Sequence, residues 1–309
     1  IITFGFAYNS VQSNTICLAW QKAFGIEPAT MGIILTALTL LIIFGGIQRV
    51  AKFSSTVVPV MAVVYLLIAV GVVIWNITSL PKVLLIIIEN AFGFNQAAGG
   101  VLGVTVIQGI KRGLFSNEAG EGSAPNAAAV ATVSHPVKQG LIQALGVFTD
   151  TLVVCSCTAF IILMSGVDVT ASNGIQLTQD ALTHEIGSIG NPFVAVMIWL
   201  FAFCSIIGNY YYGETNVRYI KDSRLGVFIY RLAVAAMVMI GAIVSLDFAW
   251  SFADITMALL TLCNLAAIVL LSRQAVFLLQ DYRQQKKEGK NPVFNKENMP
   301  EIADKLEAW

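Results

Sequence analysis

A polar, glycine-rich run, GLFSNEAGEGSAP at 113–125, lies between apolar segments and is the stretch most able to do chemistry. Gly113 and Gly120 permit backbone conformations that other residues resist, while Ser116 and Asn117 add short hydrogen-bonding groups that favour turns and caps over helix interiors. At membrane depth such a backbone is tolerated only where protein buries it or where it lines a wet cavity. Discontinuous helices of this kind hold substrates and coupling ions in secondary transporters. The run is therefore a candidate binding site, and the alternative is an ordinary loop after a complete span.

The composition places this run in a polytopic membrane protein. Hydrophobic residues make up 57% of the chain and charged residues 12%, whereas soluble domains carry about 25% charge. A net charge of zero argues against nucleic acid or an acidic molecule as a partner. The five cysteines fall inside apolar segments, where they are typical of packing residues and do not suggest a disulfide framework or a metal site. We expect no cofactor.

Segments long enough to cross about 30 Å of hydrocarbon number eight. They lie near 4–24, 31–48, 56–77, 98–132, 139–165, 191–213, 228–246 and 251–279. The fourth, 98–132, is expected to be a broken helix because it contains the polar run. The apolar run Val83–Ile88 before it is too short to span, and we expect a surface helix there. Residues 1–281 would form the transmembrane domain and 282–309 a solvated polar tail, with one possible short helix at Glu301–Ala308.

The first crossing carries an unusually polar patch, which must face protein or water and not lipid. Gln12 and Thr15 are three residues apart and so share a helix face. We take these two as candidate substrate-binding residues. The alternative is that the polar groups hold helices together. The whole patch comprises Asn9, Ser10, Gln12, Ser13, Asn14 and Thr15.

Charged residues inside the apolar segments mark a further possible site. Asp150, about midway along the fifth crossing, is a candidate for a proton relay or an ion site, since an intramembrane acid is by default functional. The alternative for Asp150 is a structural carboxylate that caps the unwound stretch. Lys111 and Arg112 next to the polar run are costly in lipid unless they reach an aqueous face. His184, in a loop section with helical spacing, is expected to be solvated.

The distribution of lysine and arginine between loops predicts the orientation. The loops after the even-numbered crossings and the C-terminal tail are basic, whereas the opposite loops hold mainly acidic residues, Lys22 and Lys82. The C-terminus and the start of the first crossing should therefore be cytoplasmic. The chain begins at Ile1, without Met and inside an apolar element, so we expect part of the natural protein to precede it.

Several motifs together resemble the alanine/glycine:cation symporter family of bacteria. GLFSNEAGEGSAPNAAA is followed by SHPVKQG and GVFTDTLVVCSCTA, and YNSVQSNTI at 8–16 and FAFCSIIGNYYYGE at 201–214 match further runs of that family. The resemblance extends to about Leu271. It implies an all-α inverted-repeat transporter fold with eleven spans, of which the eight crossings here would be the last eight. The family's other broken helix, with half of the site, would then precede Ile1.

The same resemblance implies a sodium site on the sixth crossing. The family commonly shows Ser-Thr after FAF, where this chain has Cys204 and Ser205, so Ser205 is left as the candidate hydroxyl ligand. A hard cation needs several oxygen ligands, which Ser205 and backbone carbonyls could partly provide. Asp150 is the second candidate ion ligand, and no metal besides sodium is expected.

These features predict a secondary transporter of the bacterial inner membrane. We expect sodium-coupled uptake of a small neutral amino acid, alanine or glycine, by alternating access. Helix-end N–H groups would bind its carboxylate and carbonyl or amide oxygens its ammonium. The stretch 113–122 and the Gln12/Thr15 face are the candidates, with Phe115 excluding longer side chains.

Three alternatives differ in class or in coupling ion. Proton coupling on the same fold would use Asp150. A membrane-embedded enzyme lacks support because no HExxH, GxSxG or paired-Asp pattern occurs in the sequence. An ion channel would favour symmetric pore-lining rings, whereas this long asymmetric chain with one broken helix suits a carrier.

Overall fold

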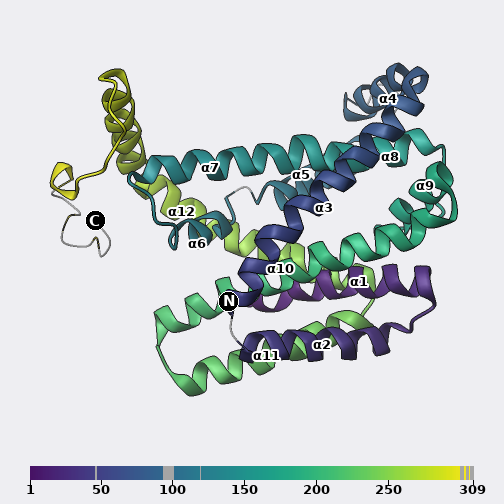
Figure 1. The fold of residues 1–309 in the computed structure, drawn as a ribbon, viewed down its shortest axis with the longest axis horizontal. Coiled ribbons are helices and arrows are strands. Elements are labelled where there is room, and N and C mark those ends of the chain that lie inside the picture. The colour runs from purple at the N-terminus through teal and green to yellow at the C-terminus, as the bar shows by residue number, and fades with distance from the viewer. Residues whose placement is uncertain (46, 93–100, 119, 300–302, 304–305, 307–309) are drawn as a thin grey trace.

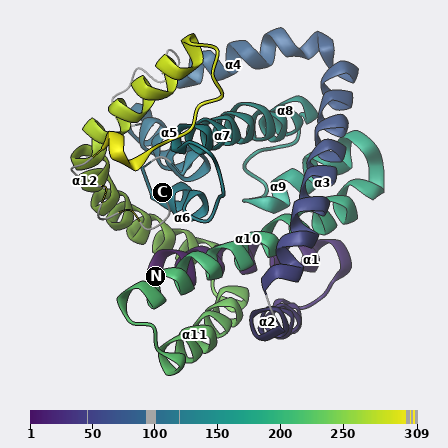
Figure 2. The ribbon, with the colours of Figure 1, turned by 60° about the vertical axis from the view of Figure 1, so that its left-hand side comes forward.

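The computed structural model describes residues 1–45, 47–92, 101–118, 120–299, 303 and 306. Helices make up most of these residues, and no strand occurs among them. The fold is therefore all-α, as the sequence predicts. Figures 1 and 2 show the chain as long helices joined by short connections. The α-helices are α1 (Asn9–Phe24), α2 (Pro28–Gly45), α3 (Ile47–Trp75), α4 (Leu80–Phe92), α5 (Val101–Asn117), α6 (Ser123–Ala128), α7 (Pro136–Phe148), α8 (Cys155–Ser165), α9 (Ile175–Ile186), α10 (Gly190–Ile220), α11 (Arg224–Ile243) and α12 (Leu246–Lys287).

Two π-helical segments interrupt the regular helices. The segment η1 (Thr3–Tyr8) leads directly into α1, and η3 (Thr149–Val154) joins α7 to α8 in one long rod. Short 3-10 turns lie at Ile77–Ser79, Gly187–Ile189 and Lys296–Asn298. Nothing in the residue types of the two π segments predicts them. Because π turns are frequent at functional sites, η1 and η3 are candidate positions for such a site.

Six helical stretches of the described residues are long and apolar enough to cross a membrane: Pro28–Gly45, Val58–Trp75, Pro136–Ser165, Ile175–Ile220, Arg224–Ile243 and Leu246–Lys287. The two other predicted crossings are helical but fall outside this set. The first, η1 with α1, contains the polar patch, which lowers its hydropathy. The fourth is interrupted after α5, and its predicted start at 98–100 lies outside the described residues. The predicted surface helix is present as α4.

The helices α1, α2, α10 and α11 pack together around one apolar core. Ile16, Leu35, Ile206 and Val238, one from each helix, are completely buried there. The close approach of α11 to α1 depends on Gly241, because a Cβ at this position would lie 2.5 Å from the Cα of Ser10. In Figure 1 these four helices lie together in the lower part of the view, and α5, α6 and α12 lie above them.

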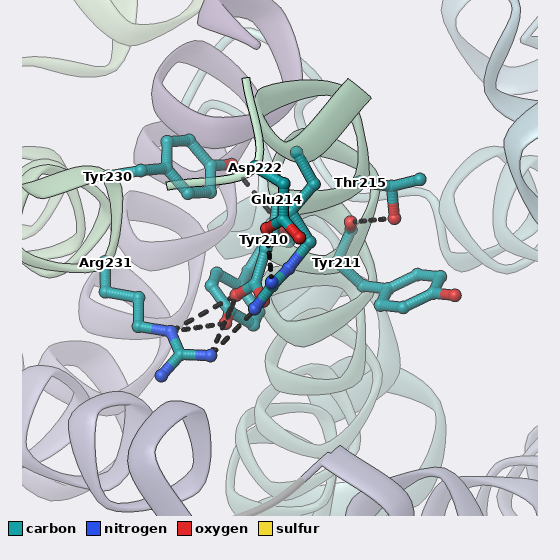
Figure 3. A network of polar contacts seen from close by, with 8 residues as sticks. Tyr210, Tyr211, Glu214, Thr215, Asp222, Tyr230 and Arg231 are labelled. Carbon is teal, nitrogen blue, oxygen red and sulfur yellow. Dashed lines mark hydrogen bonds and ion pairs between the residues drawn. The ribbon is translucent and has the colours of Figure 1, made fainter. Parts of the chain in front are cut away.

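A charged network ties α10 to α11 near their connection. Glu214 pairs with Arg218 on its own helix (2.8 Å) and with Arg231 on α11 (3.1 Å). The hydroxyl of Tyr210 donates a hydrogen bond to the same carboxylate, and Figure 3 shows these side chains converging on Glu214. The guanidinium of Arg231 also lies over the ring of Phe44 on α2, 5.3 Å from its centre. The basic residues of this expected cytoplasmic end are therefore partly fixed in place.

The C-terminal tail differs from the solvated segment that the sequence predicts. After α12 ends at Lys287, the chain folds back and buries Phe294 and Met299. The amide of Phe294 donates to the carbonyl of Ser134 (2.8 Å), in the loop before α7. The polar composition of the tail gives no sign that these two apolar side chains are buried. The possible helix at 301–308 lies mainly outside the described residues.

The loop before α7 is held by the same contacts. His135 caps α7 through Nδ1, which accepts from the amide of Val137 (3.2 Å), and its Nε2 lies 3.1 Å from Asp281 on α12. His135 is completely buried, although the sequence places it in a basic loop. The other histidine, His184, is exposed, as predicted.

Candidate functional site

The polar run contains a true helix break, which is shorter than the sequence predicts. The helix α5 continues through Asn117, so Gly113, Phe115, Ser116 and Asn117 are helical and not unwound. Glu118 and residues 120–122 are not helical, and α6 begins at Ser123. Positive φ angles occur at Glu118 (51°), Gly120 (76°) and Gly122 (89°), so the glycines supply a backbone that β-branched residues would resist. The structure thus favours the broken helix over the alternative of a complete span followed by an ordinary loop.

The break is supported by α12, a contact that the sequence does not reveal. The amide of Asn264 donates to the carbonyl of Gly120 (2.8 Å). The same side chain packs on Gly122, where a Cβ would lie 3.0 Å from Asn264 Cγ. Asn117 contributes from the other side, because its amide donates to the carbonyl of Gly113 (3.3 Å). The Asn264 amide satisfies a carbonyl that the irregular backbone would otherwise leave free, whereas the Asn117 bond lies within the last turn of α5.

The basic pair before the break is neutralised by an acidic partner. Arg112 lies 2.5 Å from Asp254 on α12 and Lys111 lies 3.6 Å from it. The guanidinium also stacks 4.1 Å from the centre of the Trp250 ring. From the sequence we expect this pair to reach an aqueous face. In the structure the pair is also neutralised by the carboxylate of Asp254, which no local sequence pattern predicts.

The π segment η3 brings Asp150 next to the end of α5. Ser116 hydrogen-bonds the Asp150 carboxyl, and its hydroxyl lies 3.1 Å from the thiol of Cys155. Asp150 and Ser116, which the sequence analysis selects for different reasons, are therefore neighbours.

A cavity of about 540 Å³ brings Asp150 together with Ser205. Ser205 projects from α10, and its hydroxyl donates to the carbonyl of Phe201 (3.1 Å), which leaves its oxygen lone pairs available. The cavity thus joins the two predicted ion ligands with the edge of the break. Its lining also includes Val58, Ala62, Glu118, Val154, Phe201, Cys204, Gly208, Asn209 and Tyr212.

The polar patch of the first crossing divides between two faces of the helix. Ser13 donates to the carbonyl of Val238 (2.6 Å), and Asn14 donates to the carbonyls of Gly241 (3.0 Å) and Val244 (2.8 Å). Ser10 makes a similar bond to α11. The helix-joining interpretation therefore holds for this face.

Gln12 and Thr15 lie on the other face and are half-buried. Thr15 donates to the carbonyl of Val11 within its own helix (2.9 Å). Neither residue lines the cavity of Asp150 and Ser205. They follow Tyr8 by four and seven residues, a spacing that puts all three on one side of the helix.

Tyr8 connects this face of the first crossing to the break. Its hydroxyl donates to Oε2 of Glu121 (2.6 Å), and its ring meets that of Phe115 edge to face, with centres 5.2 Å apart. Phe115 also packs on Trp250 (4.9 Å), so it stands in an aromatic cluster between the two helices. The sequence analysis missed both Tyr8 and Glu121. The signal available was the presence of two carboxyl groups, Glu118 and Glu121, inside a glycine-rich stretch.

Comparisons with known proteins identify the family of this chain. The model of the sodium:alanine symporter family matches residues 1–296. The probable sodium/glutamine symporter GlnT of Bacillus subtilis (strain 168) is 53% identical over 297 residues, which cover 96% of this chain and 62% of that protein. The amino-acid carrier protein AlsT of the same organism is 50% identical over 308 residues, 100% of this chain and 66% of AlsT.

The name of a third relative includes the proton as well as sodium. The sodium/proton-dependent alanine carrier protein of Bacillus sp. (strain PS3) is 37% identical over 303 residues, 92% of this chain and 68% of that protein. The chain spans less than two thirds of the length of GlnT and about two thirds of AlsT. The family consists of symporters and not of enzymes. Among the described residues six helical stretches are long and apolar enough to cross a membrane. With these stretches and a family match along residues 1–296, this chain belongs to the sodium:alanine symporter family.

Proposed function

We propose that the full-length protein takes up a small neutral amino acid, alanine or glycine, together with sodium by alternating access. The observation that carries this proposal is the cavity in which Asp150 and Ser205 face the edge of the helix break. Two ligand candidates from different helices meet there beside irregular backbone, which is the arrangement that secondary transporters use for coupled binding.

The lining of the cavity suits a hard monovalent cation. The Ser205 hydroxyl, the Asp150 carboxylate and the Asn209 amide supply oxygen atoms, the ligand type such a cation prefers. The C-terminal end of α5 adds a negative helix end. The volume of about 540 Å³ falls within the range of about 300–1,000 Å³ for small-molecule sites.

The proposed substrate-binding residues extend from the break to the first crossing. The aromatic cluster around Phe115 would limit the size of the side chain, since each surplus methylene is worth about 1–3 kcal/mol of discrimination. The proposed set is Gln12, Thr15, Gly113, Phe115, Ser116, Asn117 and Gly120, with Ser205 and Asp150 for sodium.

Proton coupling and a different substrate are the competing proposals. The name of the PS3 relative includes a proton, and Asp150 could carry one. The name of GlnT makes glutamine a second candidate substrate. The basic loops further support an inner-membrane location with the C-terminus in the cytoplasm.

Transport by the full-length protein in proteoliposomes tests the proposal. Saturable uptake of labelled alanine or glycine should follow an inward sodium gradient, and excess unlabelled glutamine should compete only if it is also bound. Uptake that ignores sodium and follows a pH gradient would assign the coupling ion to the proton. Ion conductance without any amino acid would instead indicate a channel.

A further inference from the structure

The helix break contains a carboxyl group outside the cavity described above. Glu121 is 1% exposed. Its Oε2 accepts the hydrogen bond from Tyr8, whereas Oε1 is buried and has no hydrogen-bond partner among the described residues. Half of this carboxyl is therefore satisfied by a neutral donor, and the other half is satisfied by no described group.

The groups that surround Glu121 do not supply a positive charge. From η1 and α1 it meets Tyr8, whose ring is flanked by Phe4 and Phe115. The break itself contributes Glu118, a second carboxyl. Asp254 on α12 lies near Tyr8 and already pairs with Arg112 and Lys111, and Tyr212 of α10 packs against the apolar cluster that includes Tyr8. No ion pair found among the described residues includes Glu121.

An ionised carboxylate would be unfavourable in this position. Burial of a charge without a partner costs several kcal/mol, and the neighbouring carboxyl of Glu118 would add repulsion. A protonated carboxyl has no net charge, and its new O–H at Oε1 becomes a donor. The arrangement in this structure therefore favours the neutral form of Glu121.

The backbone on both sides of Glu121 departs from regular helical geometry. Glu118, Gly120 and Gly122 have positive φ angles, and a few residues of this kind can absorb a large change in helix direction. A displacement of the break would separate Glu121 from Tyr8 and admit water to the carboxyl group.

We propose that Glu121 is a proton-binding site, loaded when the break is closed and emptied when it opens. A hydronium ion gives its proton to the carboxylate, forming a carboxylic acid and water, and the reverse reaction returns the proton to water. This inference rests on the proposed function, because it adds a proton site to the sodium site of Asp150 and Ser205. The proton would control closure of the break during each transport cycle.

The pH dependence of uptake tests this role in the full-length protein in proteoliposomes. Sodium-driven alanine uptake by the wild type should decline as pH rises, by about tenfold per pH unit once the group titrates, because the closed state requires the protonated form. Glu121→Gln mimics that form permanently and should give a flat profile. Glu27→Gln, at an exposed carboxyl in the α1–α2 loop, is the matched control and should follow the wild type.

Tyr8→Phe gives a second, directional readout. This variant keeps the ring but removes the hydroxyl that stabilises the carboxylate, so the decline of uptake should move to higher pH. A Glu121→Gln protein with the wild-type pH profile would overturn the proposal. So would a Tyr8→Phe profile displaced toward lower pH.

Infrared spectroscopy separates this proposal from the proposed transport function. The purified full-length protein at neutral pH, without substrate, should show the carbonyl band of a protonated carboxylic acid. That band should vanish in Glu121→Gln and persist in Glu27→Gln. If the band changes in this way and no sodium-driven uptake occurs, the proton site stands and the proposed symport fails. If uptake occurs but the wild type lacks the band, the proton site is refuted alone.

Discussion

Removal of the Ser205 hydroxyl should weaken sodium binding without destroying the fold. Ser205 is exposed to the cavity, and its one hydrogen bond within the protein goes to a carbonyl of its own helix. Ser205→Ala therefore deletes a cation ligand and leaves no buried group unpaired. Interactions with charged groups contribute about 1.5–3 kcal/mol, and an exposed ligand belongs at the lower end. About 1.4 kcal/mol corresponds to a tenfold change in binding.

The expected result is a rise of about tenfold in the sodium concentration for half-maximal alanine uptake. Uptake at saturating sodium should largely recover. Linkage requires the apparent affinity for alanine to fall at a fixed low sodium concentration, because ligands that favour the same state lose affinity together. The assay is initial-rate uptake by the full-length protein across a range of sodium concentrations.

Two further variants sharpen this experiment. Thr215→Ala removes a hydroxyl from the same helix with the same type of carbonyl bond, 3.0 Å to Tyr211 (Figure 3), but away from the cavity. Its sodium dependence should match the wild type. Cys204→Ser replaces a cavity-lining thiol with an oxygen, the better ligand for a hard cation, and should lower the half-maximal concentration. Unchanged sodium dependence in Ser205→Ala would refute the assignment of this helix to the sodium site.

Gly120→Val should abolish uptake with membrane expression retained, because a β-branched residue opposes a φ of 76° and its Cβ would lie 3.2 Å from Leu265. Uptake at the wild-type rate would contradict this view of the break. Gln12→Leu and Thr15→Val should each raise the KM for alanine severalfold, the scale of one hydrogen bond of about 0.5–1.5 kcal/mol. Lower protein abundance with an unchanged KM would show that Gln12 and Thr15 support the fold and do not bind substrate. Phe294→Ala should release the tail, detected as faster trypsin cleavage near Lys286–Lys290, and an unchanged cleavage rate would show that this anchor is dispensable.

The sequence predicts elements whose signal is local. Hydrophobic runs of helical length predict the positions of the six apolar spans and of α4. Gly120 and Gly122 predict the break, because glycine accepts backbone conformations that other residues resist. The exact start of the break was not predictable. Gly113 and Ser116 look like turn residues, yet both lie within the helix α5.

Features that depend on contacts between distant residues escaped the sequence analysis. The Tyr8–Glu121 bond joins residues 113 positions apart, and Asn264 reaches Gly120 across 144. The polar residues of the first crossing could not be divided into two faces from the sequence, because the division depends on the carbonyls near the end of α11 that accept hydrogen bonds from Ser13 and Asn14. The tail is predicted to be solvated because its few apolar residues have no periodicity. In the structure Phe294 and Met299 are nevertheless buried.

The helix α12 contacts two distant parts of the molecule. Its Asn264 holds the break, and its Asp281 contacts the loop before α7, about 25 Å farther along the helix at 1.5 Å per residue. A continuous helix transmits a tilt from one contact to the other, like a lever. A fluorescent probe on the C-terminal tail, outside the cavity, should therefore report displacement of the broken helix.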